Sequence, residues 1–228
     1  MKFPSFLFSF LVFFILASGE QQAWAKNGWP KCPENGRNVE IFMETSMGDL
    51  KYHKGLNSRQ LSKMRGNVGR RLGPMWIPTG LTVADENYHL KTGTKIYQLG
   101  RGRFCAVLES AQLFIGYRNI DVYISNKYRQ GSCEHDSILN HENVHVQIFR
   151  DTLYKHAGGI ERAIRKKAPR IGPVYLRSAN AAANKLQRLL DAQIRPLFKR
   201  MSSDISRKNA RIDTKANYRR EQAMCQDW

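Results

Sequence analysis

Several features are missing from this chain of 228 residues, and each absence excludes a class of protein to which it could belong. Beyond the first 17 residues there is no apolar run long enough to cross a bilayer. The sequence has no Cys-x-x-Cys pair, no internal repeat and no low-complexity tract. Metal binding through cysteine pairs, a solenoid and a long disordered tail are therefore not expected.

Acidic residues are also scarce, since 19 Asp and Glu stand against 37 Lys and Arg and give a net charge of +18. The excess is concentrated in the second half, where the stretch from Ile160 onward holds 17 basic and six acidic residues. A basic surface attracts anionic partners, and anionic cell-envelope material is one candidate. The alternative is a solvated basic surface without a partner. No aromatic residues alternate with the basic ones as in base-stacking proteins, so no nucleic-acid partner is expected.

The first 25 residues have the pattern of a secretory signal peptide. A positive start at Met1-Lys2 is followed by an apolar run through Ala17 and by Ala23-Trp24-Ala25, an Ala-x-Ala cleavage site. Cleavage after Ala25 would release a secreted or periplasmic protein of residues 26–228, with no transmembrane segment and a length that suits one domain. An uncleaved N-terminal anchor is the alternative.

All four cysteines lie in the expected mature part: Cys32, Cys105, Cys133 and Cys225. An even number of cysteines in an exported chain indicates two disulfides. Sequence alone does not fix the pairing. We favour Cys105–Cys133 and Cys32–Cys225, the second of which would tie the two ends together.

Residues 37–125 are expected to be rich in β-structure. Short runs of β-branched and aromatic residues are separated by glycines, which predicts several short strands in a small antiparallel or mixed sheet. The expected strands are 39–43, 51–53, 81–83, 88–90, 95–99, 104–115 and 119–125.

Residues 134–228 are expected to be helical, so the fold class is α+β. One helix should end at Gly158-Gly159, because glycine is unfavourable inside a helix. An amphipathic helix is expected over 176–194, and Pro196 should kink or restart it.

The motif His141-Glu142-x-x-His145 is the main indication of chemistry. Four residues make a little over one helical turn, so both imidazoles lie on one face and can bind one Zn²⁺. Glu142 can then reach a water on that ion. The flanks are apolar, as expected for a helix that is buried apart from this face. A chance match on a structural helix is the alternative.

A catalytic zinc site usually has three protein ligands, so the motif needs one more. Asp213 and Tyr218 lie on a distant segment that could fold back to the motif. Glu161 follows the Gly158-Gly159 pair at which the helix is expected to end. These three side chains are the candidates for the third ligand.

Other side chains suit the role less well. On a straight helix Asp151 would lie about 280° around the axis from His141, which places it on the surface. His156 would lie about 16 Å beyond His145 along the axis, too far to share an ion. The remaining histidines have no motif around them and are expected to be structural or exposed; they are His53, His89 and His135.

The order of these parts resembles a bacterial family of unknown function whose members are described as secreted zinc-dependent proteases. The resemblance covers roughly 39–228, and the His-Glu-x-x-His motif is its most specific part. The family often carries Asp-x-x-Thr-x-His-Gly near its end. Asp213 matches that aspartate, whereas Ala216, Tyr218 and Arg219 replace the threonine, histidine and glycine. The resemblance implies a zincin-like α+β fold and a Zn²⁺ cofactor, with Tyr218 in place of the histidine.

The leading hypothesis is a secreted or periplasmic zinc metallopeptidase acting on a peptide or protein substrate. Glu142 would be the general base that takes a proton from a zinc-activated water. Tyr123, Tyr154 and Tyr218 are candidates for stabilising the oxyanion. Residues 119–125, expected to be the edge strand beside the cleft, could align an extended substrate through backbone hydrogen bonds.

The sequence leaves two alternative functions open. One is a zinc amidase or related hydrolase of cell-wall material, held by the basic half of the chain. The other is a non-catalytic envelope binding protein of the same fold.

Overall fold

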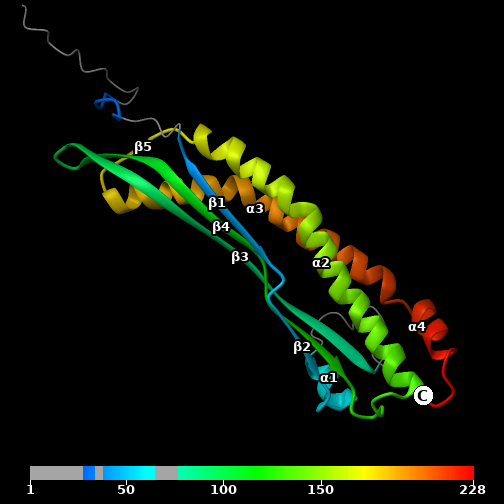
Figure 1. Ribbon diagram of the computed structural model, residues 1–228. Coiled ribbons are helices and arrows are strands. Elements are labelled where there is room, and N and C mark those ends of the chain that lie inside the picture. The colour runs from blue at the N-terminus through cyan, green and yellow to red at the C-terminus, as the bar shows by residue number, and fades with distance from the viewer. Residues whose placement is uncertain (1–27, 34–37, 65–76) are drawn as a thin grey trace, which may run out of the picture. The chain divides into compact units, whose positions relative to one another are not determined.

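A computed structural model describes residues 28–33, 38–64 and 77–228 (Figure 1). The expected signal peptide and its cleavage site lie outside these residues. All elements discussed below belong to one compact unit, Cys32–Trp228. In the described part, none of the helices has the length and hydropathy needed to span a bilayer.

A long β-hairpin forms the larger part of the sheet. Strand β3 (Gly80–Gly100) pairs antiparallel with β4 (Arg103–Ile124) along its whole length. Three shorter strands follow one another along the other edge of β4. In order along β4 they are β5 (Val174–Leu176), which is antiparallel, then β1 (Glu40–Ser46) and β2 (Asp49–His53), which are parallel. The protein is therefore α+β with a mixed five-stranded sheet.

The expectation of several short strands between residues 80 and 125 was wrong, because they form only β3 and β4. Gly93 and Gly116 lie inside these strands rather than in turns. Gly116 has a φ of +151°, and a Cβ there would lie 2.0 Å from the carbonyl oxygen of Ser46. Glycine is thus needed for the close approach of β1 to β4.

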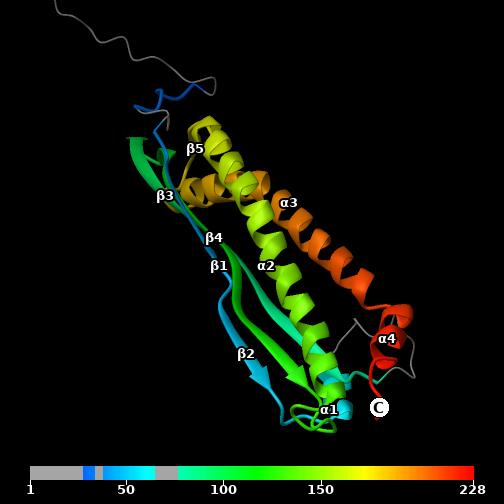
Figure 2. The same ribbon diagram turned by 45° about the vertical axis from the view of Figure 1, so that its right-hand side comes forward.

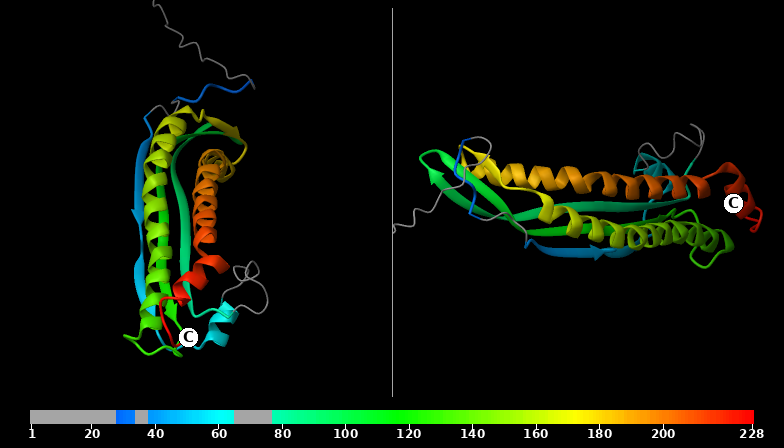
Figure 3. Two further views of the ribbon diagram at one scale, coloured as in Figure 1. Left: turned by 90° about the vertical axis from the view of Figure 1, so that its right-hand side faces the viewer. Right: turned by 90° about the horizontal axis from the view of Figure 1, so that it is seen from above.

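Two long helices cover the sheet. Helix α2 (Cys133–Lys167) and helix α3 (Ala179–Ile212) run antiparallel to each other along it (Figures 2 and 3). Alternate residues of β4, such as Leu113, Ile115 and Tyr117, are buried in one core with residues of both helices. Shorter elements complete the chain: α1 (Ser58–Met64), the 3₁₀ helix η2 (Ala168–Arg170) and α4 (Lys215–Gln222).

The expected ends of the helices were also wrong. α2 continues through Gly158-Gly159 without a break. On either side of the glycines, Leu153, Ile160 and Ile164 are buried at helical spacing against the core. Their burial outweighs the helix cost of two glycines, about 1 kcal/mol each. α3 likewise continues beyond the expected end at residue 194. The expected kink is present, because the axis of α3 changes direction near the middle (Figure 2).

The favoured disulfide pairing was wrong as well. The two disulfides are Cys32–Cys105 and Cys133–Cys225. Cys105 lies near the start of the 22-residue strand β4, whereas Cys133 begins α2 beyond the other end of that strand. The length of β4 therefore separates these two cysteines. Cys133–Cys225 instead fixes the segment after α4 to the first residue of α2.

Candidate metal centre

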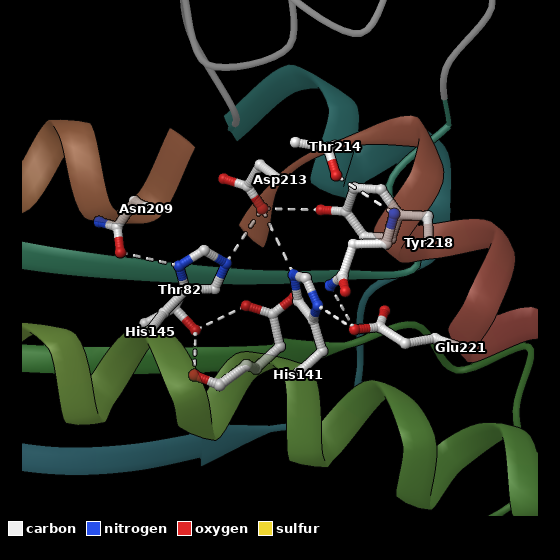
Figure 4. Close-up of polar contacts among 10 residues, drawn as sticks. Thr82, His141, His145, Asn209, Asp213, Thr214, Tyr218 and Glu221 are labelled. Carbon is white, nitrogen blue, oxygen red and sulfur yellow. Dashed lines mark hydrogen bonds and ion pairs between the residues drawn. The ribbon is translucent and has the colours of Figure 1, made fainter. Parts of the chain in front are cut away.

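Three side chains from α2 and from the residue after α3 converge on one point (Figure 4). The Nε2 atoms of His141 and His145 lie 3.3 Å and 3.2 Å from Oδ1 of Asp213. Two ligand atoms that each lie 2.0–2.1 Å from a tetrahedral ion are about 3.3 Å apart. All three side chains offer ligand atoms within 4.8 Å of one another. This donor set fits a divalent metal ion.

The other nitrogen of each imidazole is held by a separate acceptor. His141 Nδ1 lies 3.0 Å from Oε1 of Glu221, and His145 Nδ1 lies 3.0 Å from Oδ1 of Asn209. Asn217 donates a hydrogen bond of 2.7 Å to the same Glu221 oxygen. When each Nδ1 carries the donated proton, the Nε2 lone pair is free to bind a metal.

The charges of the cluster favour proton binding at the imidazoles in the metal-free protein. Burial lowers the pKa of His141, but hydrogen bonds to Asp213 and Glu221 outweigh it and raise the pKa to about 9. The pKa of His145 is also raised, because the hydrogen bond to Asp213 and the charge of Glu142 outweigh its burial. Burial acts to raise the pKa of Asp213, yet the two imidazoles hold it below its usual range. A metal ion would therefore displace protons when it binds.

Glu142 lies beside the cluster in a nearly closed environment. Its burial raises the pKa of the carboxyl group, against the lowering effects of His145 and Thr82. The Thr82 hydroxyl lies 2.6 Å from Oε2 of Glu142 and thereby fixes the carboxylate. On β3, Gly80 leaves room for the same side chain, because a Cβ there would lie 2.4 Å from Oε1. A carboxylate with a raised pKa is suited to accept a proton near neutral pH.

Tyr218 on α4 joins the cluster through its hydroxyl group, which lies 2.8 Å from Oδ1 of Asp213. Its ring centroid is 4.8 Å from that of His141. Burial and the neighbouring Asp213 raise the pKa of the phenol well above its ordinary value. The hydroxyl thus stays protonated and can donate a hydrogen bond.

A cavity of about 410 Å³ opens onto these side chains. Its walls come from the start of β3, from one face each of α2 and α3, and from α4 with the segment that follows it. His141, Glu142, His145 and Asp213 all line it, so a ligand in the cavity would reach the cluster.

Of the candidate third ligands, the structure brings Asp213 and Tyr218 to the motif and leaves Glu161 away from it. Glu161 forms an exposed ion pair with Arg165 one turn further along α2. Because α2 is continuous, Glu161 lies about 24 Å along its axis from His145. The helix break that would have turned it back does not exist.

Other side chains considered from the sequence also lie elsewhere. His156 contacts Asp204, and Asp151 contacts Gln147. Tyr123 stacks on His53, and neither it nor Tyr154 lines the cavity. Cys133, Glu134 and Cys225 form a second group with metal-ligand atoms, but the disulfide occupies both sulfurs.

The expectation that residues 119–125 form an edge strand was wrong. In β4 they pair with β2 on one side and with β3 on the other. β3 is instead the strand beside the cavity. No described strand pairs with its other edge.

Sequence reasoning did not find Thr82, Asn209 or Glu221. Asn209 could have been found from the sequence. Where two helices run antiparallel, each step forward along one helix is opposite a step backward along the other, so the numbers of facing residues have a nearly constant sum. With α2 and α3 taken as continuous, placing Asp213 opposite His141 also places Asn209 opposite His145. Thr82 and Glu221 depend on the sheet and on α4, for which the sequence has no comparable signal.

No family model, curated protein or solved structure matches this chain.

Replacing Glu221 by Ala is expected to weaken divalent-metal binding by about 10–100-fold, because His141 loses the partner that fixes its ring. The matched control is Glu161→Ala on α2, which removes an exposed glutamate far from the cluster and should leave the affinity unchanged. Competition titration against a chromogenic chelator measures both. Equal affinities of the two variants would contradict the role of Glu221.

Proposed function

We propose that this chain is an exported zinc-dependent metallopeptidase with a zincin-like arrangement of its site. The observation that carries the proposal is the convergence of His141, His145 and Asp213, with the buried carboxylate of Glu142 beside them. Two imidazoles and one carboxylate are a donor set typical of catalytic zinc, which keeps a further position for water.

His141, His145 and Asp213 would hold the ion, and a bound Zn²⁺ would supply the Lewis acidity that lowers the pKa of a water and polarises a carbonyl. Glu142 accepts the proton of the attacking water, and its raised pKa lets it pass this proton to the leaving amine. Tyr218 remains protonated, and its hydroxyl donates its single proton to Asp213. By turning from Asp213 it would donate a hydrogen bond to the oxygen on which negative charge develops.

The edge of β3 with which no described strand pairs favours a peptide as the substrate. Residues 80–82 of β3 line the cavity consecutively, as does the segment 77–79 that leads into the strand. Consecutive lining by strand residues occurs when a cavity touches the edge of a strand rather than one face. The Thr79 carbonyl accepts a hydrogen bond from Ser125 of 2.8 Å. By the alternation of an antiparallel ladder, the backbone groups of Gly80 and Thr82 then point away from β4. An extended peptide could pair with them beside Glu142.

A zinc hydrolase of anionic cell-wall material is the second candidate, favoured by the net charge of +18. Among the described residues, however, no Lys or Arg lines the cavity. Basic side chains could therefore attract an anionic polymer to the outer surface of the protein, but no described one would attract it to the reacting groups. We therefore rank the peptide first.

Two measurements on the purified mature protein test the proposal. Elemental analysis after dialysis should find zinc in a one-to-one ratio, and a peptide library should be cut by the zinc-loaded protein. Restoration of cleavage by zinc after chelator treatment is the control for a contaminating protease. Absence of stoichiometric zinc, or an uncut library with zinc present, would refute it.

Replacing Gly80 by Ala is expected to lower peptide hydrolysis by about 10²-fold without loss of zinc, because the new methyl group would displace the general base. A Cβ at this position would lie 2.4 Å from Oε1 of Glu142 and 2.7 Å from Cγ2 of Ile138. Gly55→Ala is the matched control, since a Cβ there meets nothing within 4 Å. Unchanged kcat in Gly80→Ala would show that Glu142 tolerates the shift.

A further inference from the structure

The cavity at the metal centre has an uncharged wall on each side of the cluster. On α2, Ile138 precedes Glu142 by one turn and Phe149 follows His145 by one turn, and both line the cavity. Trp228 lines it from the segment after α4. The ionisable side chains that line it all belong to the cluster or contact it directly: His141, Glu142, His145, Asp213, Tyr218 and Glu221.

The room in the cavity arises from small side chains on α3. Ser206 and Ala210 are one turn apart on the face of α3 that lines the cavity, next to Asn209. Phe149 of α2 lines the same cavity. Larger residues at these two positions would fill the space beside His145. A volume of about 410 Å³ lies in the lower part of the range for small-ligand sites and suits a short piece of peptide.

The absence of positive charge is informative in this chain, because 37 of its 228 residues are Lys or Arg. In the described structure none of them lines the cavity. Apart from the proposed metal ion, which the carbonyl of the substrate would occupy, an acidic side chain or a phosphate in the cavity would lose its hydration without meeting a described Lys or Arg. An apolar side chain would lose nothing on leaving water and would gain contacts with the walls.

We propose that the cavity is a specificity pocket for a bulky apolar side chain, next to the bond that is cut, between Phe149 on α2 and Ala210 on α3. The inference rests on the proposed metallopeptidase function and names its substrate class: peptides with a large aliphatic or aromatic residue at that position. Acidic residues are rejected there.

The test measures binding to the zinc-loaded protein by calorimetry, with three hydroxamates that share one metal-binding group. Acetohydroxamate carries only a methyl group, a phenylpropanoyl hydroxamate adds an aromatic ring, and a succinyl hydroxamate adds a carboxylate. The aromatic compound should bind about 10–100-fold tighter than acetohydroxamate, because it buries a large apolar side chain. The succinyl compound should bind no tighter than acetohydroxamate.

Two variants of α3 test whether the gain in affinity of the aromatic compound arises in the proposed pocket. Ala210→Phe fills the proposed pocket and should bring the affinity ratio of the aromatic compound to acetohydroxamate close to one. Ala192→Phe adds the same ring at an exposed position of α3 and should keep the wild-type ratio. Zinc content verifies that each variant is folded at the centre.

The outcomes separate the two proposals. If acetohydroxamate binds but the aromatic compound gains nothing, or if Ala210→Phe keeps the gain, the apolar pocket is refuted and the metal centre stands. If the succinyl compound binds tightest, the pocket selects acidic side chains instead. If the protein takes up no zinc, the metallopeptidase function and the pocket are both refuted.

Discussion

Glu142→Gln is expected to reduce peptide hydrolysis by about 10²–10⁴-fold while zinc remains bound. Glutamine keeps the size of the side chain, and its amide oxygen can still accept the hydrogen bond from Thr82. It cannot accept a proton, so the attacking water and the leaving amine both lose their proton carrier. Steady-state cleavage of a fluorogenic peptide and elemental analysis measure the two properties separately.

The matched control is Glu109→Gln, which makes the same change at an exposed glutamate of β4. It should cleave the peptide at the wild-type rate. Full activity of Glu142→Gln would remove the general base from the mechanism. Loss of zinc in that variant would assign Glu142 to the coordination of the ion.

Asp213→Ala is expected to weaken zinc binding by more than about 100-fold, beyond the 10–100-fold effect of removing an outer hydrogen-bond partner. The substitution removes the only described carboxylate that both Nε2 atoms contact, at 3.2 Å and 3.3 Å. It also leaves two buried imidazoles without that acceptor. Competition against a chelator gives the affinity, and the cleavage assay should show no activity at any practical zinc concentration.

Asp151→Ala provides the comparison for Asp213→Ala. Asp151 is an exposed carboxylate six residues after His145, and it does not line the cavity. Its removal should leave zinc affinity and hydrolysis unchanged. Similar zinc affinities in the two variants would show that Asp213 is not a ligand and that Tyr218 or water completes the site.

The motif helix could be predicted because His141, Glu142 and His145 satisfy a purely local condition, one face of one helix. Its length could not. Whether Gly158-Gly159 ends the helix depends on what Ile160 and Ile164 bury, and that burial involves β4 and α3. In the same way, a glycine such as Gly93 or Gly116 can end a strand, or it can lie inside a strand where a neighbouring group comes close. Only the position of the neighbouring strand shows which of these two roles applies.

The candidate site was predictable only in part for a related reason. Asp213 could be named as a candidate but not selected, since its contact with His141 spans 72 residues and requires α3 to return along α2. The disulfide pairing is a similar case, because four cysteines allow three pairings and local sequence does not distinguish among them. Here β5 brings Tyr175 beside Cys105, and the Tyr175 hydroxyl accepts a hydrogen bond from the backbone of Cys32.

Helix α4 has no fully buried side chain, and Tyr218 and Glu221, which it supplies to the centre, are only partly buried. Hydrophobic burial therefore contributes little to holding it, and its attachment depends on those polar contacts and on the disulfide Cys133–Cys225. Such a segment can open locally without unfolding the sheet. A ligand that binds only the closed form shifts that local equilibrium toward closure. A metal ion would not bind α4 itself, but it would fix His141 and Asp213, the two side chains that Glu221 and Tyr218 of α4 contact. Metal binding would thereby favour the attached position of α4 and of the cavity wall that α4 forms.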